Sequence, residues 1–322
     1  MKRFAVMILL LTLFMGLSAC RARVPKELPK LSPETESETE TLRETETETE
    51  TVTETETETE TEAAVLVSEI SLPYSSLIME KGMSITPKLS IYPLDAENKN
   101  IIISSSDPAV AEVDENGTLT AKGAGSCNIS FTSEGTPNVS AQLSVEVKEA
   151  PSPLYIDGTV IVNKTYALPQ SYGSGSDSEA MDNFAVLKNE ASKEGIILGI
   201  ISGFRSYELQ SSVYKNYSAR DGKEAADRFS ARPGHSEHQS GLAFDVNSLE
   251  RSFADSTEGK WLAENCHRYG FIIRYPEICE EHTGYMYEPW HVRYVGKELA
   301  GKIKESGLCL EEYFGISSEY AE

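Results

Sequence analysis

The chain has 322 residues, with 51 acidic and 29 basic side chains, and its formal net charge is −22. This length is enough for two domains with additional tails. Residues 34–62 contain 13 Glu and one Arg, so this segment alone carries −12 of the −22. The net acidity therefore describes mainly one segment and says little about an active site, and we expect no nucleic-acid partner.

Residues 1–20 have the pattern of a secretory signal peptide. Lys2 and Arg3 precede an apolar run over residues 4–17, which is too short for a comfortable membrane span, and small residues precede Cys20. Residues 17–20 (LSAC) resemble a bacterial lipobox, which implies cleavage before Cys20 and attachment of a lipid to its sulfur. The alternative is an ordinary signal peptide whose cysteine is incidental. We expect a lipid-anchored protein on the extracellular face of the bacterial cell membrane that reaches into the cell wall.

Residues 21–62 are expected to be an acidic Thr-Glu linker. The segment has few apolar residues to bury and its like charges repel, so we expect it to be disordered and extended. Such a spacer fits a protein that is held on a membrane while its target lies in the wall outside. The alternative is a solvated tail with no particular length requirement.

Residues 63–148 change character and predict an all-β domain. The pair Asn116-Gly117 is a strong hairpin turn signal. Several short strands separated by Gly, Pro and Asn indicate a β-sandwich. The expected strands cover residues 67–72, 101–104, 119–121, 127–131 and 143–147.

The same region resembles the bacterial Ig-like domains of group 2. The likeness lies in residues 105–117 (SSDPAVAEVDENG) and 121–125 (AKGAG). That family often has Trp where Ile103 stands here, so we expect different core packing at this position. The resemblance implies a fold and suggests spacing or surface adhesion, of which a plain spacer is the favoured interpretation.

Residues 149–154, with two prolines, are expected to be a hinge ahead of a second domain at residues 155–322. Helices alternate irregularly with strands there, which indicates an α+β domain. The expected helices cover residues 178–194, 207–217, 223–229 and 261–269, and the expected strands cover residues 196–201 and 271–274.

The most informative segment of the second domain is residues 236–245 (SEHQSGLAFD). Apolar residues alternate with small residues and Asp245, which is the period-two pattern of a half-buried strand. His238 lies upstream of Gly241, where the chain can turn back towards Asp245. The alternative for Ser236 to His238 is a helix cap or a solvated loop.

A second segment, residues 288–296 (EPWHVRYVG), also reads as a strand. In an unbroken strand Glu288 and His291 would point to opposite faces. Pro289 disfavours a regular strand interior, so we expect a bend that brings Glu288 to the side of His291. Two histidines and a carboxylate form a donor set typical of catalytic zinc.

These motifs, together with residues 202–207 (SGFRSY), resemble the VanY-type zinc D-alanyl-D-alanine carboxypeptidases of the M15 peptidases. The likeness covers roughly residues 155–314. The resemblance implies an α+β zinc peptidase domain of the hedgehog/D-Ala-D-Ala peptidase type, preceded here by the all-β Ig-like sandwich. It further implies that Zn²⁺ is the cofactor and that its ligands are His238, Asp245 and His291.

The resemblance also implies roles for other residues. Glu288 is the expected catalytic base and Arg205 the expected transition-state stabiliser. Ser236, Gln210 and Arg293 are the expected substrate-binding residues, although the sequence alone left Arg232, Arg274 and Arg293 as equal candidates for the terminal carboxylate.

The expected function is zinc-dependent removal of the C-terminal D-Ala from peptidoglycan stem peptides. One alternative is L,D-carboxypeptidase activity on tetrapeptide stems. Another is a non-catalytic cell-wall-binding or adhesion protein.

The remaining histidines and cysteines are weaker candidates. His235 is a possible substitute ligand, whereas His267 and His282 are expected to be structural or solvated. Secretion permits disulfides, and a Cys266–Cys279 bridge is one possibility on weak evidence of spacing.

Overall fold

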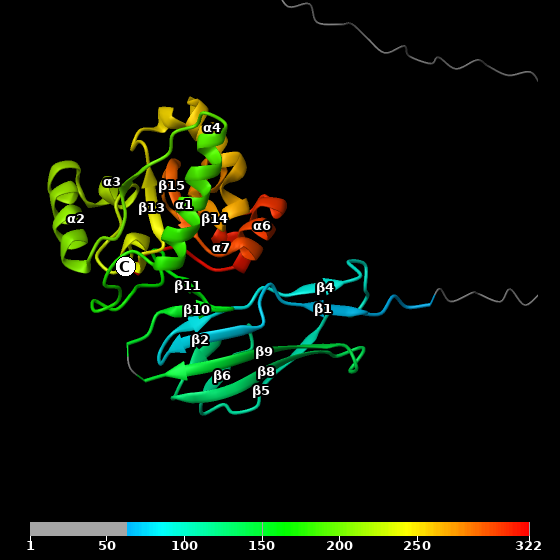
Figure 1. The fold of residues 1–322 in the computed structure, drawn as a ribbon. Helices are drawn as coiled ribbons and strands as arrows, with labels where there is room; N and C mark the ends of the chain where they lie inside the picture. Colours follow the sequence, from blue (N-terminus) through cyan, green and yellow to red (C-terminus); the bar gives the residue numbers. More distant parts are fainter. Residues whose placement is uncertain (1–62, 150, 322) are drawn as a thin grey trace, which may run out of the picture. The chain divides into compact units, whose positions relative to one another are not determined.

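The computed structural model describes residues 63–149 and 151–321. The expected signal peptide, Cys20 and the expected Thr-Glu linker lie outside the described residues. The chain forms a β-rich part and an α+β part, as predicted (Figure 1). No helix within the described ranges is long and apolar enough to cross a membrane.

The β-rich part contains three sheets. The largest has the strand order β11-β10-β2-β9-β8-β5, in which β2 and β9 are parallel and the other pairs are antiparallel. Its strands are β2 (Ser76–Glu80), β5 (Ile101–Ser105), β8 (Gly125–Ser133), β9 (Ser140–Lys148), β10 (Leu154–Ile156) and β11 (Thr159–Ile161). The smaller sheets join β3 (Ser84–Ile85), β6 (Ala111–Val113) and β7 (Leu119–Ala121), and β1 (Glu69–Ser71) and β4 (Ser90–Tyr92).

Alternation along the long strands builds the core of this part. In β8, Cys127, Ile129 and Phe131 are buried while the residues between them are more exposed, which is the period-two pattern of a sheet with one covered face. The predicted turn at Asn116-Gly117 joins β6 to β7. Gly117 has φ +80°, and the Asp114 carboxylate accepts the N–H of Asn116, so the turn is fixed locally.

The sheet of the β-rich part continues beyond the predicted hinge. Tyr155 and Ile156 of β10 pair with Ile78 and Leu77 of β2, and β11 then pairs with β10. The expected boundary at residues 149–154 therefore falls between two strands of one sheet rather than between two separate cores.

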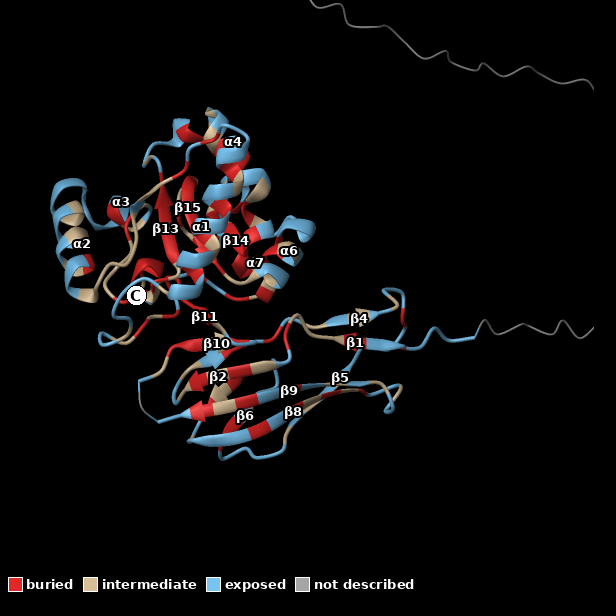
Figure 2. Cartoon of the chain, viewed as in Figure 1, coloured by how far each residue is buried: buried red, intermediate tan, exposed pale blue. Residues whose placement is uncertain are grey.

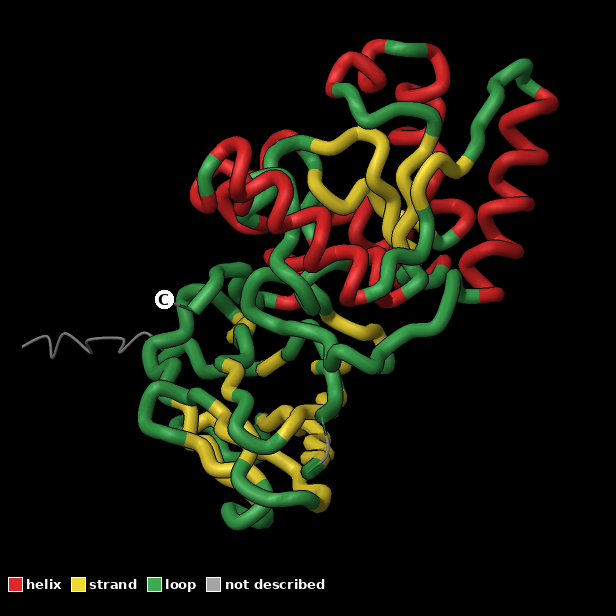
Figure 3. Tube along the Cα trace, turned by 90° about the vertical axis from the view of Figure 1, so that its left-hand side faces the viewer, coloured by secondary structure: helices red, strands yellow, loops and turns green. Residues whose placement is uncertain are grey.

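The α+β part is built on an antiparallel sheet of order β12-β13-β15-β14. The strands are β12 (Ile200–Ser202), β13 (Ala243–Val246), β14 (Phe271–Tyr275) and β15 (Glu288–Tyr294). All residues of β13 and β15 are buried (Figure 2). Figure 3 shows helices gathered around these strands. They include α1 (Ser178–Lys193), α2 (Tyr207–Asp221), α3 (Lys223–Asp227), α4 (Thr257–Asn265), α5 (Glu280–Thr283), α6 (Lys297–Ser306) and α7 (Leu310–Phe314).

Aromatic packing fixes α1 on the sheet. The ring of Phe184 lies 5.7 Å from that of Phe244 and 5.9 Å from that of Phe271, in edge-on arrangements. Asp177 caps the helix by accepting the N–H of Ala180, so the predicted start of this helix is confirmed. The predicted strand at residues 196–201 is shorter than expected and begins only at Ile200.

Candidate metal centre

His238 lies in a short 3₁₀ helix, η1 (Glu237–Ser240), that ends at Gly241. Gly241 has φ +77°, and a Cβ there would lie 2.3 Å from the carbonyl oxygen of Gly175. Only glycine fits this reversal, because other residues meet both backbone strain and a collision. The turn sends the chain into β13 and places His238 near Asp245.

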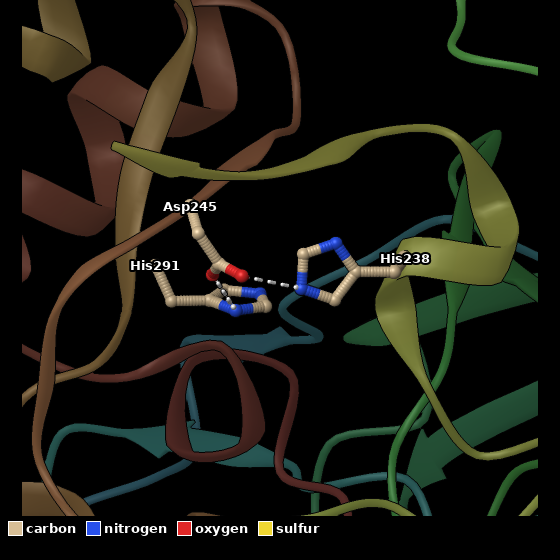
Figure 4. Close-up of side chains that lie close together, drawn as sticks. All are labelled: His238, Asp245 and His291. Carbon is tan, nitrogen blue, oxygen red and sulfur yellow. Dashed lines mark ion pairs between the residues drawn. The ribbon is translucent and has the colours of Figure 1, made fainter. Parts of the chain in front are cut away.

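Asp245 and His291 lie opposite each other on the paired strands β13 and β15. Asp245 Oδ1 is 3.2 Å from His291 Nδ1, and Asp245 Oδ2 is 3.3 Å from His238 Nε2. Figure 4 shows the carboxylate lying between the two imidazoles. One ligand atom from each residue lies within 4.8 Å of the others, and all three side chains are buried.

The outer nitrogen of each imidazole faces its own acceptor. His238 Nδ1 is 2.8 Å from the carbonyl oxygen of Gly203, so it donates its proton there and leaves Nε2 free for the cluster. His291 Nε2 lies 3.5 Å from Glu237 Oε2, an ionic contact without hydrogen-bond geometry, and its Nδ1 lies towards Asp245. A hydrogen bond such as that of His238 to Gly203 fixes the tautomer of a histidine that binds metal.

Glu237 is itself held by buried arginines. Its Oε1 accepts from Arg274 Nε at 2.7 Å and from Arg293 Nη1 at 2.8 Å, and all three side chains are fully buried. Burial alone would raise the pKa of Glu237, but the charges of Arg274 and Arg293 hold it well below its ordinary value. Glu237 therefore stays ionised behind His291.

Glu288 enters the cluster from the first residue of β15. Its Oε2 is 3.6 Å from His291 Nδ1, so both side chains reach the same side of the strand. The register of β14 against β15 shifts between Ile273 and Tyr275, next to the pairing of Tyr275 with Glu288. Between the pairings of Ile273 and of Tyr275, β14 advances by two residues and β15 by four, so the extra residues lie in β15 at 289–291 and include Pro289, where the bend was expected. Burial raises the pKa of Glu288 from 4.5 to about 7.

Arg205 approaches from the loop after β12. Its guanidinium donates to Gln210 Oε1 at 2.9 Å and to Ser202 Oγ at 3.1 Å. Gln210 in turn donates to the carbonyl oxygen of Ala231 at 2.6 Å. The guanidinium is thus oriented by neighbours from two elements before any ligand arrives.

A cavity of about 410 Å³ opens onto these groups. Its polar lining includes Ser236 and Gln210 beside the cluster, and its remaining wall is apolar and aromatic. This combination of convergent polar groups with apolar walls is typical of a small-ligand site. The cavity is lined by Arg205, Gln210, Ser236, Glu237, His238, Asp245, Glu288 and His291, and by Val213, Tyr217, Phe229, Leu249, Tyr275, Tyr285, Met286 and Trp290, among others.

The three-residue cluster fits a divalent metal on its own geometry and charge. Asp245 Oδ1 is buried and lies 3.2 Å from His291 Nδ1 without hydrogen-bond geometry, so a cation would satisfy a carboxylate oxygen that has no hydrogen bond. Burial would lower the pKa of His291, yet Asp245 and Glu237 raise it to about 9, whereas burial holds the pKa of His238 below its ordinary value. Two imidazoles and one carboxylate are also a donor set used by catalytic zinc.

Comparisons with known proteins agree with both parts of the chain. A family model described as VanY, D-alanyl-D-alanine carboxypeptidase, matches residues 174–297, and a bacterial Ig-like domain (group 2) model matches residues 66–147. A putative carboxypeptidase, YodJ, from Bacillus subtilis (strain 168) is 41% identical over 180 residues, which are 48% of this chain and 66% of that protein. The chain belongs to the VanY D-alanyl-D-alanine carboxypeptidase family.

Two solved structures also match the VanY-family part. The LdcB LD-carboxypeptidase is 45% identical, and the match covers 50% of this chain and 89% of that one with a TM-score of 0.47. The vancomycin resistance D,D-pentapeptidase VanY, solved in complex with Zn(II), is 36% identical, and the match covers 48% of this chain and 97% of that one with a TM-score of 0.43. The chain spans between 44% and 66% of the length of the curated relatives it matches.

The structure brings together most of the residues that the VanY resemblance implied, but not Arg293. Its side chain is fully buried, and its nitrogens donate to Glu237, to the carbonyl oxygen of Tyr294 and to that of Val160. The expectation that Arg293 binds substrate is therefore wrong, because it points behind the cluster rather than into the cavity. Arg274 is equally buried, and Arg232 pairs with Asp227 away from the lining.

The other two expected substrate-binding residues lie where the cavity is. Ser236 and Gln210 both line it. Both polar ends of the Gln210 amide are already bound, to Arg205 and to Ala231, so its contact with a ligand would be indirect. His235 is not part of the cluster, since its Nδ1 donates to the carbonyl oxygen of Asn163 at 2.8 Å.

Sequence reasoning missed Glu237 as a functional residue. It precedes His238 directly, and this adjacency suggested only a cap or a loop. Its role depends on Arg274 and Arg293, which are distant in the sequence and meet it only in the folded chain. A glutamate beside a candidate ligand was the only sequence signal.

Proposed function

We propose that this protein is a zinc-dependent D-alanyl-D-alanine carboxypeptidase that removes the C-terminal D-Ala from peptidoglycan stem peptides. The observation that carries the proposal is the convergence of His238, Asp245 and His291 beside Glu288, at a cavity that also receives Arg205. Membership of the VanY family supports the substrate class. The 36% identical VanY solved with Zn(II) supports the metal.

His238, Asp245 and His291 would hold the zinc, which when bound polarises a carbonyl group and makes water more acidic. Glu288 is the base in this proposal. With a pKa of about 7 it is partly ionised near neutral pH, so it takes a proton from the attacking water and returns it to the departing amine. Its distance of 3.6 Å from His291 Nδ1 places it beside the ligand set.

Arg205 supplies fixed positive charge to the same cavity. An arginine remains charged throughout the working pH range and presents several donors in one plane. Held by Gln210 and Ser202, its guanidinium stabilises the negative charge that develops on the substrate carbonyl oxygen. Among the described residues, no other arginine lines this cavity.

A second candidate is L,D-carboxypeptidase activity on tetrapeptide stems. It is favoured by the 45% identity with the LdcB LD-carboxypeptidase, which covers 89% of that chain. The two activities share the reaction centre and differ in the configuration of the residue that precedes the scissile bond. The wall of the cavity, rather than the metal cluster, therefore decides between them.

Digestion of defined stem peptides tests both candidates. The zinc-loaded protein is incubated separately with pentapeptide and tetrapeptide stems, and the released amino acid and shortened stem are identified by mass spectrometry. Release of D-Ala from the pentapeptide supports the proposal, and cleavage of the tetrapeptide alone supports the second candidate. Absence of cleavage in both supports a silent, wall-binding domain.

Glu288→Gln is the matched variant for the mechanism. We expect it to lower kcat by about 10²–10⁴-fold, because the proton acceptor is lost while the shape is kept. Zinc content measured by elemental analysis should stay near one per chain, since Glu288 is not one of the three ligands. Unchanged turnover in this variant would remove Glu288 from the mechanism.

A further inference from the structure

The described residues include four cysteines, and two of them lie together. Cys127 packs in the β-rich core and Cys266 packs in the core between α4 and the sheet. Cys279 and Cys309 instead form a cluster with Glu312, in which the ligand-type atoms of all three lie within 4.8 Å of one another. The sulfur that neighbours Cys279 is therefore that of Cys309, not that of Cys266 as the spacing suggested.

Both cysteines occupy the ends of short helical segments. Cys279 ends the 3₁₀ helix η4 (Glu277–Cys279) and precedes α5, whereas Cys309 caps α7. Glu312 lies in the first turn of α7, where its Oε2 accepts the N–H of Cys309 at 3.1 Å and the thiol of Cys279 at 3.2 Å. Glu312 thus binds the thiol of Cys279 and the backbone of Cys309, which keeps the two residues side by side.

We propose that Cys279 and Cys309 form a disulfide bond in the mature protein. Each thiol gives up a proton, and the pair gives up two electrons to a disulfide oxidant such as oxidised glutathione. One sulfur–sulfur bond forms in the protein, and the sulfur–sulfur bond of the oxidant breaks to release two thiols. The signal peptide expected at residues 1–20 would carry the chain to a compartment where such bonds persist.

Charge and donor number favour this bond over a second metal site. Two thiolates and the Glu312 carboxylate would carry three negative charges in a buried cluster, and a divalent cation would neutralise two of them. A structural zinc also needs four donors, and His282 Nε2 approaches only the far oxygen of Glu312, at 3.2 Å.

The bond would close the loop of residues 279–309, which contains β15 and therefore Glu288 and His291. It would also fix one end of the segment that leads to Tyr285 and Met286 in the cavity wall, where Thr283 already donates to the carbonyl oxygen of Cys279 at 3.0 Å. The disulfide thus ties the cavity wall and one ligand strand to α7. A closed loop limits the unfolded chain and raises the free energy of unfolding.

The test compares reduced and oxidised forms of the full chain. Protein is incubated with oxidised glutathione and unfolded in denaturant, the remaining thiols are then alkylated, and peptides are mapped by mass spectrometry without reduction. We expect a linked peptide pair containing Cys279 and Cys309, lighter by two hydrogens, with Cys127 and Cys266 alkylated. We also expect the oxidised form to unfold at a temperature about 5–10 °C higher than the reduced form.

Two variants provide the controls. Cys309→Ser should abolish the linked pair and the temperature difference, and Cys127→Ser should keep both. Recovery of Cys279 and Cys309 as alkylated thiols after oxidation would overturn the proposal, as would a bond between Cys279 and Cys266. A second bound zinc per chain that disappears in Cys309→Ser would also overturn it and assign the cluster to a metal.

Discussion

Two glutamates beside His291 show how surroundings assign different chemistry to one residue type. Glu237 is surrounded by Arg274 and Arg293, so the pKa of its carboxyl is lowered and it remains an anion. Glu288 has no such pairing, and burial raises its pKa to about 7. The first is suited to orient a ligand and the second to exchange a proton.

Glu237 orients His291, and replacing it tests that role. In Glu237→Gln the carboxylate 3.5 Å from the outer imidazole nitrogen loses its charge, so we expect zinc affinity to fall by about 10–100-fold. The affinity is measured by competition with a chromogenic chelator. The exposed Glu250→Gln variant is the control and should bind zinc as the parent protein does. An unchanged zinc Kd in Glu237→Gln would contradict the orienting role.

His235 makes stability depend on pH. Burial lowers the pKa of its imidazole below 6.5, so the folded chain keeps it neutral while the unfolded chain takes up a proton as the pH falls below about 6.5. At low pH the unfolded state then binds more protons than the folded state, so the free energy of unfolding decreases as the pH is lowered.

The matched measurement is urea unfolding of the parent and of His235→Gln at pH 7.5 and 5.5. We expect the parent to lose more free energy of unfolding between these values than the variant does. Protonation of the metal ligands affects both proteins and cancels in the comparison. Equal losses in the two proteins would show that His235 titrates alike in both states.

At the scale of elements, the site depends on one reversal and one strand pair. η1 and β13 carry His238 and Asp245 on either side of Gly241, and β15 carries His291 opposite Asp245. Adjacent strands and a tight turn place side chains more reproducibly than long loops do. The geometry of the ligand set is therefore a property of the turn at Gly241 and of the register between β13 and β15.

Gly241→Ala tests the turn, and Gly301→Ala is its matched control. At Gly241 an added methyl group would collide with the Gly175 carbonyl oxygen, and alanine is strained at the positive φ of this position. We therefore expect the free energy of unfolding to fall by about 1–3 kcal/mol and zinc binding to weaken. At Gly301, within α6, a methyl group meets open space, and we expect a gain of up to about 1 kcal/mol. The free energy of unfolding of both variants is measured by urea unfolding. A change of the same sign in the two variants would contradict the requirement for glycine at position 241.

At the scale of the whole molecule, we propose that the Thr-Glu segment is a tether, that the Ig-like domain follows it as a spacer, and that the VanY-family domain comes after the spacer. The pairing of β10 with β2 makes the strands that follow the expected hinge part of the Ig-side sheet. Residues 149–154 therefore connect two strands of one sheet.

The proposed anchor is the lipid on Cys20. We expect mass spectrometry of the mature N-terminus to find cleavage before Cys20 and a lipid on its sulfur, and we expect Cys20→Ser to move the protein from the membrane fraction to the medium. An unmodified Cys20 at the mature N-terminus would contradict the anchor.

The sequence by itself determined the family, the two kinds of domain and the identity of the clustered residues, because motif spacing and periodicity are local properties of the chain. His238, Asp245 and Glu288 could be named from such patterns, and the turn at Asn116-Gly117 from its dipeptide. Only the tertiary structure decided which arginine reaches the cavity, that Glu237 lies behind His291, and that Cys279 meets Cys309. Those outcomes depend on burial and on partners distant in the chain, which make Arg293 a buried counterion and leave Arg205 facing the cavity.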